Sequence, residues 1–235
     1  MLSRDAYLET LDRDAQAFGE LLRHSDLSHP VPDCPGWDFG DLARHLSGIH
    51  RWAIGAIVSG APGDEPVGPV DRDELVAWLD SGAAQLLDLL RTTDPLTPAW
   101  TFGPKPRLVE FWLRRQPHET SVHLGDARRA LGVAAPVDPA FAADGVDEVV
   151  TVLIPRQVRL ERIPPLPHAL HLELTDTETS YVLRSEDDQS DPAASVRGTA
   201  HEVLLALWRR KPVEDLTIEG DAASARAVFA LALTP

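Results

Sequence analysis

Four of the nine histidines stand in two short stretches that read as helix: His45 and His50 in one, His118 and His123 in the other. In the second stretch Glu119 and His123 are four residues apart, so both side chains leave the same side of one helical turn. A carboxylate and an imidazole at this spacing can bind one cation, and His45 from a facing helix can complete a three-ligand site. Two histidines and a glutamate around an open fourth position are typical of catalytic zinc.

The two histidines of the first stretch are expected to point in different directions. His45 shares a stripe with Leu42, Ile49 and Trp52, so its ring is expected to face the interior of a helical bundle. His50 follows five residues later, about 140° further around the helix, and is expected to leave that face. Spacing alone also allows a plain structural role, because core histidines are usually hydrogen-bonded and E-x-x-x-H pairs occur often by chance.

The single cysteine, Cys34, stands between prolines and a glycine in a Pro- and Asp-rich segment. Such a segment does not supply the positive surroundings that a reactive thiol needs, so Cys34 is interpreted as a small filler. A site that combines Cys34 with His24 or His29 is the weaker hypothesis. Core positions are expected for four tryptophans: Trp37, Trp52, Trp112 and Trp208.

Five segments place apolar residues at three- and four-residue steps, the pattern of helices with one buried face. The predicted helices cover residues 3–23, 38–56, 72–91, 107–131 and 139–154. Asp38 can cap the second helix through its carboxylate. Pro117 interrupts the fourth helix, so a kink or a break is expected there.

The composition changes after residue 155. Residues 156–167 hold three prolines and read as a linker. Beyond it, alternating patterns predict strands at 170–174, 181–183 and 216–218 and helices at 201–208 and 222–233. The predicted fold is α+β, with a helical bundle at residues 1–155, the linker at 156–167 and a small α+β domain at 168–235.

Composition limits the classes of partner. The chain of 235 residues has a net charge of -15, which disfavours phosphate backbones and anionic lipid, so nucleic acid and membranes are not expected as partners. The absence of an N-terminal signal and of any apolar run near the roughly 20 residues that span a bilayer, together with a single cysteine, predicts a cytoplasmic protein. The oligomeric state stays open between monomer and homodimer.

The N-terminal motif resembles a known family. The stretch Val31-Pro32-Asp33-Cys34-Pro35-Gly36-Trp37-Asp38, continued by Asp41-Leu42-Ala43-Arg44-His45-Leu46 and His50-Arg51-Trp52, is similar to the start of the mycothiol-dependent maleylpyruvate isomerases. Residues 111–115 and 118–123 resemble the second signature of that family, and residues 204–210 and 216–221 resemble its C-terminal domain. The resemblance covers nearly the whole chain in the same order.

This resemblance implies a DinB-like up-and-down four-helix bundle with an extra helix and a sterol-carrier-like α+β C-terminal domain. It also implies that His45, Glu119 and His123 hold the metal, and that an arginine of the C-terminal domain lies near the active site. Arg210 matches that arginine, with Arg209 as the alternative. The chain departs from the family at Pro117 and at Leu124-Gly125, where many relatives have Arg-Trp, so the substrate is left open.

The implied cofactors are a divalent metal, zinc in the first place, and mycothiol. The implied reaction is that of an isomerase or S-transferase, in which a zinc-bound thiolate attacks a small electrophilic, anionic substrate while Arg210 pairs with its carboxylate. Two alternatives stay open: a metal-dependent hydrolase that uses zinc-bound water, and a non-catalytic protein that binds a metal or a thiol. The expected partners are a small-molecule thiol and an electrophilic substrate.

Overall fold

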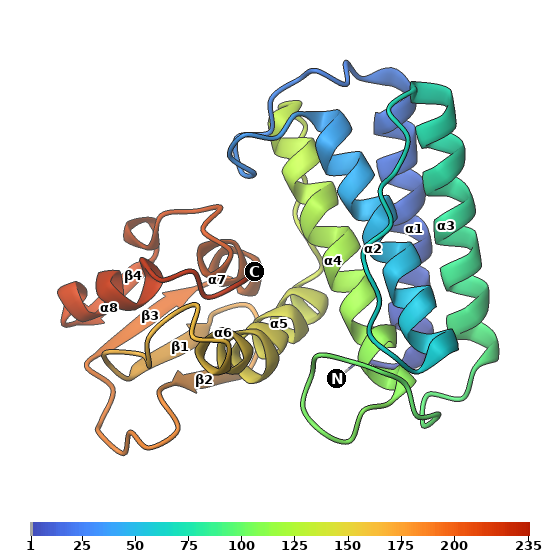
Figure 1. The fold of residues 1–235 in the computed structure, drawn as a ribbon. Coiled ribbons are helices and arrows are strands. Elements are labelled where there is room, and N and C mark those ends of the chain that lie inside the picture. Colours follow the sequence, from blue (N-terminus) through green and yellow to red (C-terminus); the bar gives the residue numbers. More distant parts are fainter. Residues whose placement is uncertain (1) are drawn as a thin grey trace. The chain divides into compact units, whose positions relative to one another are not determined.

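The structure, a computed structural model, describes residues 2–235, and they form two compact units (Figure 1). The first unit comprises residues 2–135 and the second residues 136–235. Among the described residues, no helix combines the length and the apolar character needed to cross a bilayer.

The first unit is a bundle of four helices. They are α1 (Arg4–His24), α2 (Phe39–Ser59), α3 (Arg72–Thr92) and α4 (Val109–Ala130). Both α1 and α2 pack against α3 and α4. The four helices predicted for this part of the chain are confirmed, and their starts follow from capping. At α2, for example, the Asp41 backbone N–H donates to the Asp38 side chain at 2.8 Å, and the Asp38 N–H donates to Asp41 at 3.1 Å.

The bundle core is formed by the predicted apolar stripes. Fully or almost fully buried residues from all four helices meet in one cluster: Phe18, Leu22, Phe39, Leu42, Leu46, Leu75, Leu79, Leu124 and Ala127. Burial of each large side chain contributes about 1.5–3 kcal/mol. This packing fixes α2 against α4, the two helices that carry the chemically interesting residues.

Pro117 lies inside α4 without ending it. Of the two expected outcomes, a break is therefore wrong for the helix at Val109–Ala130, and a kink stays a prediction. Proline leaves the carbonyl four residues earlier without its helical donor, but buried residues precede and follow Pro117 in α4. Tertiary packing on both sides keeps the helix continuous.

The second unit combines helices with a four-stranded sheet. It begins with α5 (Pro139–Glu148), a π-helical turn (Val149–Leu153) and α6 (Ile154–Arg159). The sheet contains β1 (Leu170–Leu174), β2 (Thr179–Leu183), β3 (Ala194–Gly198) and β4 (Thr217–Gly220), and α7 (Ala200–Leu207) and α8 (Ala222–Phe229) complete the unit. The strand order is β2-β1-β3-β4, with β1 parallel to β3 and the other pairs antiparallel. The α+β fold class is confirmed.

Two details of the second unit differ from the prediction. The predicted bundle extends to residue 155, but α5 packs against α7 and belongs to the second unit, so the division falls at residues 135/136. The extra helix is thus not part of the bundle, and the predicted linker at 156–167 begins as the end of α6. Strand β3 is missing from the prediction. Its sequence, Ala-Ser-Val-Arg-Gly, does not show the alternation of apolar and polar residues that marks a strand.

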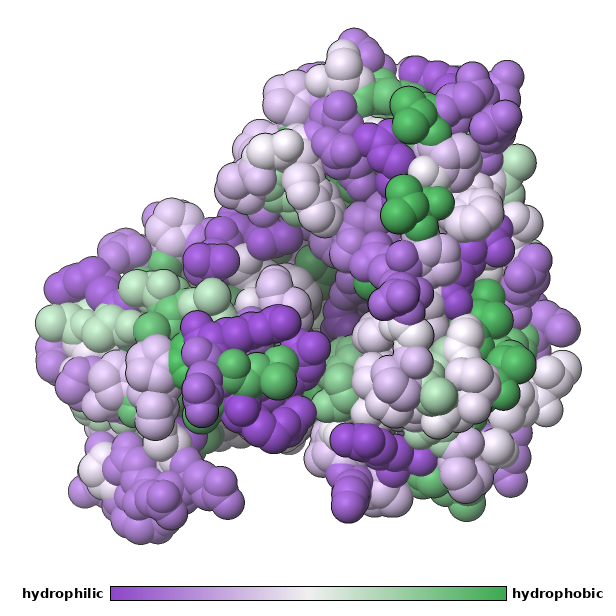
Figure 2. Space-filling view, in the orientation of Figure 1, coloured by the Kyte–Doolittle hydropathy of each residue, from purple (hydrophilic) through white to green (hydrophobic). Residues whose placement is uncertain are grey.

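The surface is mainly polar. In Figure 2 hydrophilic residues cover most of the visible face, and hydrophobic residues appear in separate patches. The large hydrophobic residues with high exposure are few, among them Val58, Val67, Val70 and Leu96. The hydrophobic residues are therefore mostly used in the cores of the two units.

Candidate metal centre

The structure brings together the three residues that spacing had singled out. His45 comes from α2, and Glu119 and His123 lie one turn apart on α4. His45 Nε2 lies 3.5 Å from Glu119 Oε1, and His123 Nε2 lies 3.3 Å from the same oxygen. The two imidazole rings stand edge to face, with their centroids 5.1 Å apart.

These separations suit a metal ion. Two ligands that each lie about 2.0–2.1 Å from zinc at a tetrahedral angle are about 3.3 Å apart. The three donor atoms of His45, Glu119 and His123 all lie within 4.8 Å of one another. The donor set, two imidazoles and one carboxylate, therefore fits a divalent cation in both chemistry and spacing.

Each of the three side chains also has a second contact, made through the atom that is not turned toward the other two candidate ligands. His45 Nδ1 lies 3.1 Å from Glu65 Oε1, and His123 Nδ1 lies 3.0 Å from Asp126 Oδ2. Arg115 donates to Glu119 Oε2, which leaves Oε1 toward the two imidazoles. Outer contacts of this kind orient metal ligands and select the imidazole tautomer with a free Nε2.

A partly buried network of hydrogen bonds continues from His123 through the buried Asp126. Asp126 Oδ1 accepts a hydrogen bond from Arg129 at 2.6 Å, and Arg129 Nε donates to Asp33 at 2.5 Å. The Cys34 thiol donates to Asp126 Oδ2 at 3.5 Å. Cys34 therefore lies beside the candidate centre, which the interpretation as a loop filler missed. Its position depends on how the loop folds onto α4, which no local pattern reveals.

The charges of the metal-free site follow from these contacts. Burial opposes ionisation of Glu119, but Arg115 and the two histidines outweigh it and hold the pKa of Glu119 well below its usual value. Burial likewise opposes a charge on His123, but hydrogen bonds with Asp126, Cys34 and Glu119 raise its pKa well above the usual value. Contacts with Glu119 and Glu65 raise the pKa of His45 in the same way, against its burial. These shifts favour the protonated imidazoles in the metal-free protein, so protons compete with a cation for the same nitrogen atoms.

His50 does not leave the bundle interior, so that expectation is wrong. It is 0% exposed, and its Nε2 lies 2.9 Å from Thr120 Oγ1 on α4. Helix α2 packs against both α3 and α4, so its buried arc is wide enough to include His50, whereas the His45 side chain is 25% exposed at the edge of that arc. Burial lowers the pKa of His50 to about 4, so it stays neutral at physiological pH.

Among the tryptophans, Trp37 has a place near the site. Its ring centroid lies 4.9 Å from that of His45, so it forms a wall beside the candidate ligand and is only partly buried. Trp112 is fully buried and Trp208 nearly so, as expected for core residues. Trp52 contacts Trp112 edge to face within an aromatic cluster of the bundle.

Two family models match successive parts of the chain. The model described as the mycothiol maleylpyruvate isomerase N-terminal domain matches residues 8–128, and the MDMPI C-terminal domain matches residues 140–227. The chain belongs to the mycothiol maleylpyruvate isomerase family. The gap between the two matches contains the division at residues 135/136. Family membership supports the prediction that the chain is an enzyme.

Two solved structures share the fold. One is the crystal structure of the mycothiol-dependent maleylpyruvate isomerase, which is 16% identical to this chain with a TM-score of 0.61 and covers 94% of this chain and 95% of that one. The other is a histidine-to-alanine mutant of that isomerase, with 16% identity, a TM-score of 0.60 and the same coverage. At this identity the likeness establishes the fold alone. The comparison with curated proteins found no match.

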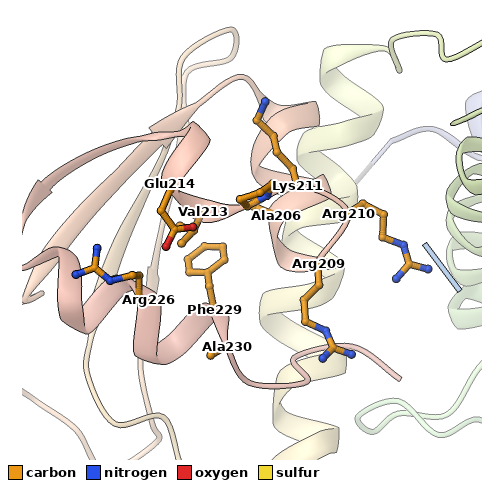
Figure 3. Close-up of a pocket in the computed structure, with 10 residues that line it drawn as sticks. Ala206, Arg209, Arg210, Lys211, Val213, Glu214, Arg226, Phe229 and Ala230 are labelled. Atoms are coloured by element: carbon orange, nitrogen blue, oxygen red, sulfur yellow. The ribbon is translucent and has the colours of Figure 1, made fainter. Parts of the chain in front are cut away.

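Arg210, the arginine expected from the family's C-terminal domain, lines a mainly basic cavity of the second unit, and its side chain extends away from Phe229 and Glu214 (Figure 3). The cavity measures about 500 Å³ and is lined by Ala206, Arg209, Arg210, Lys211, Pro212, Val213, Glu214, Arg226, Phe229 and Ala230. Arg210 Nη1 donates to the Trp208 carbonyl at 2.9 Å. Arg209 has a φ of +57°, a conformation that glycine usually provides after a helix. The role of Arg210 in catalysis stays a prediction.

Proposed function

We propose that this family member is a metal-dependent, mycothiol-dependent isomerase or S-transferase. His45, Glu119 and His123 would hold the metal, with zinc as the favoured ion. The observation that carries the proposal is the spacing of 3.5 and 3.3 Å between the imidazole nitrogens and one carboxylate oxygen. The contacts behind all three side chains support it further, since each leaves one donor atom turned toward the common point.

A bound zinc would lower the pKa of a thiol at its open position far below the usual value of about 8.5, so that the thiolate forms at neutral pH. The chain's own residues prepare that position. Arg115 keeps Glu119 ionised, and Asp126 and Glu65 keep the Nδ1 protons of the two histidines engaged. Trp37 packs against one side of the His45 ring.

Bound mycothiol would supply a thiolate that adds reversibly to an electron-poor double bond and so would allow its geometry to change without gain or loss of any atom. In the S-transferase alternative the same thiolate would displace a leaving group from carbon.

An anionic substrate would need a local positive group, because the chain as a whole has a net charge of -15. Arg210 is our candidate, since it matches the family's arginine and lies in a cavity with two further arginines and a lysine. Its guanidinium can pair with a carboxylate through two parallel hydrogen bonds.

Metal analysis of the purified protein tests the proposal first. We expect one divalent ion per chain, and loss of most of it on single replacement of His45, Glu119 or His123 by alanine. His50→Ala is the matched control from the same helix and should keep the metal, with circular dichroism to show that it is folded. Retention of metal by all three ligand variants would contradict the metal site.

Turnover then separates the reaction classes. The metal-loaded protein should bind mycothiol in a calorimetric titration, whereas the metal-free protein should not. Esterase or amidase activity without any thiol would point to the hydrolase instead. Metal binding without turnover with any thiol would point to a binding protein.

A further inference from the structure

The two histidines of the candidate centre are supported very unequally. Each Nδ1 faces a carboxylate, at 3.1 Å from Glu65 and 3.0 Å from Asp126. The Glu65 side chain is 41% exposed and comes from the loop between α2 and α3. Asp126 is 0% exposed and lies on α4, three residues after His123. An exposed loop carboxylate can swing into water, whereas a buried helical one cannot.

Asp126 is further fixed by a clamp, which we define as Asp126, Arg129, Asp33 and Cys34. Asp126 Oδ1 accepts from Arg129 at 2.6 Å, while Oδ2 accepts from His123 and from the Cys34 thiol. Asp33 holds Arg129 from the other side at 2.5 Å. Both carboxylate oxygens are therefore engaged, and the side chain has one allowed orientation.

The clamp also joins the loop before α2 to the metal-ligand helix. Asp33 and Cys34 come from this loop, whereas Asp126 and Arg129 come from α4. The same loop carries Trp37, whose ring lies 4.9 Å from that of His45. The buried carboxylate of Asp126 thus connects the orientation of His123 with the loop that carries Trp37.

We infer that Asp126 is the positioning residue of this centre: held by Arg129 and Cys34, it fixes the His123 ring with Nδ1–H turned away and Nε2 turned toward the metal. Glu65 plays a much smaller part for His45. The inference rests on the proposed metal site. It adds that the contact between Asp126 and His123 determines the affinity of this site for the metal ion.

The carboxylate is required because asparagine cannot replace it. Arg129 on one side and His123 with Cys34 on the other all donate, so both terminal atoms of residue 126 must accept. An amide has one acceptor oxygen and one donating NH₂ group. Asp126→Asn therefore places a donor against a donor on one side, in a site without exposure to water.

The test compares two identical chemical changes, Asp126→Asn and Glu65→Gln, in the full-length protein. The dissociation constant for Co²⁺ is measured by competition with a chromogenic chelator, and the visible Co²⁺ spectrum is recorded at saturation. Asp126→Asn should weaken binding about 10–100-fold and change the spectrum, as expected for a lost outer contact. Glu65→Gln should change the affinity less than about threefold.

The outcomes separate this inference from the metal site itself. If wild type binds Co²⁺ and Glu119→Ala does not, but Asp126→Asn binds like wild type, the inference fails and the site stands. Equal losses in Asp126→Asn and Glu65→Gln would also overturn it. If wild type binds no Co²⁺, the proposed site fails and the inference with it.

A purely structural role gives a different result. It would lower the melting temperature of metal-free Asp126→Asn without changing the Co²⁺ affinity or spectrum, and that result would overturn the inference. If Asp126→Asn does not fold, Arg129→Gln takes its place, because it loosens the clamp and leaves the contact between Asp126 and His123. Weaker binding in Arg129→Gln, about threefold or more, supports the inference, and unchanged binding refutes it.

Discussion

Metal binding should release protons near neutral pH, because both candidate imidazoles carry raised pKa values in the metal-free protein. The pKa of His123 lies well above its usual value and that of His45 is raised as well. A protonated imidazole cannot bind a metal, so each proton present must leave when the ion arrives. The perturbation is therefore a change of pH, and the response is a change of zinc affinity.

The magnitude follows from the direction of each pKa shift. A histidine with the ordinary pKa of about 6.5 holds roughly a quarter of a proton at pH 7. His45 and His123 must each hold more than this fraction, so zinc binding at pH 7 should release more than the roughly half a proton that two ordinary histidines would release. Glu119 contributes none, since its lowered pKa keeps it ionised. Zinc binding should strengthen as pH rises, about tenfold per pH unit for each proton released, until the pH exceeds both histidine pKa values.

Isothermal titration calorimetry with zinc at pH 7, in two buffers of different ionisation enthalpy, counts the protons. Glu65→Gln is the internal control: Glu65 raises the pKa of His45, so its loss should lower the proton count without abolishing binding. A count near zero, or an affinity that does not change between pH 6 and 8, would refute the charge arrangement.

Three further predictions concern residues around the centre and in the second unit. Cys34→Ser should keep thiol-dependent activity, because a hydroxyl can still donate to Asp126; lost activity would show that the thiol itself is needed. A chain that ends at residue 135 should fold and bind zinc, as circular dichroism and metal analysis would show, but it should lose turnover; full activity would exclude a role for the second unit. Arg210→Ala should lower kcat/KM for anionic electrophiles about 10–150-fold, the equivalent of a charge-assisted hydrogen bond of about 1.5–3 kcal/mol, and leave zinc content unchanged. Arg209→Gly, which suits the φ of +57° at this position, is the control. A larger loss of kcat/KM in Arg209→Gly than in Arg210→Ala would assign the role to Arg209 instead.

The helices of the bundle were predictable because their stability depends on apolar stripes that are visible in the sequence. The same holds for the pairing of Glu119 with His123, which follows from helical geometry alone. The addition of His45 needed a facing helix, and there the family resemblance supplied what spacing left open. The structure brings all three side chains together.

The predictions that were wrong or incomplete have physical causes as well. The direction of His50 was predicted from one face of one helix, whereas α2 is buried against two neighbours. The place of α5 depended on which unit its apolar stripe would pack against, and the stripe itself carries no such information. The sequence does show that Asp126 follows His123 by three residues and can face the same side of the helix. Its contact with Cys34, however, depends on the path of the loop before α2, which only the fold determines.

The central claim is that the metal centre presents an open position to a thiol, and Co²⁺ substitution tests it directly. Titration of the Co²⁺-loaded protein with mycothiol should produce a thiolate-to-cobalt charge-transfer band that saturates at one thiol per chain. The band should be absent in Glu119→Ala and present in His50→Ala. A Co²⁺-loaded protein that gives no such band with saturating mycothiol would contradict the account.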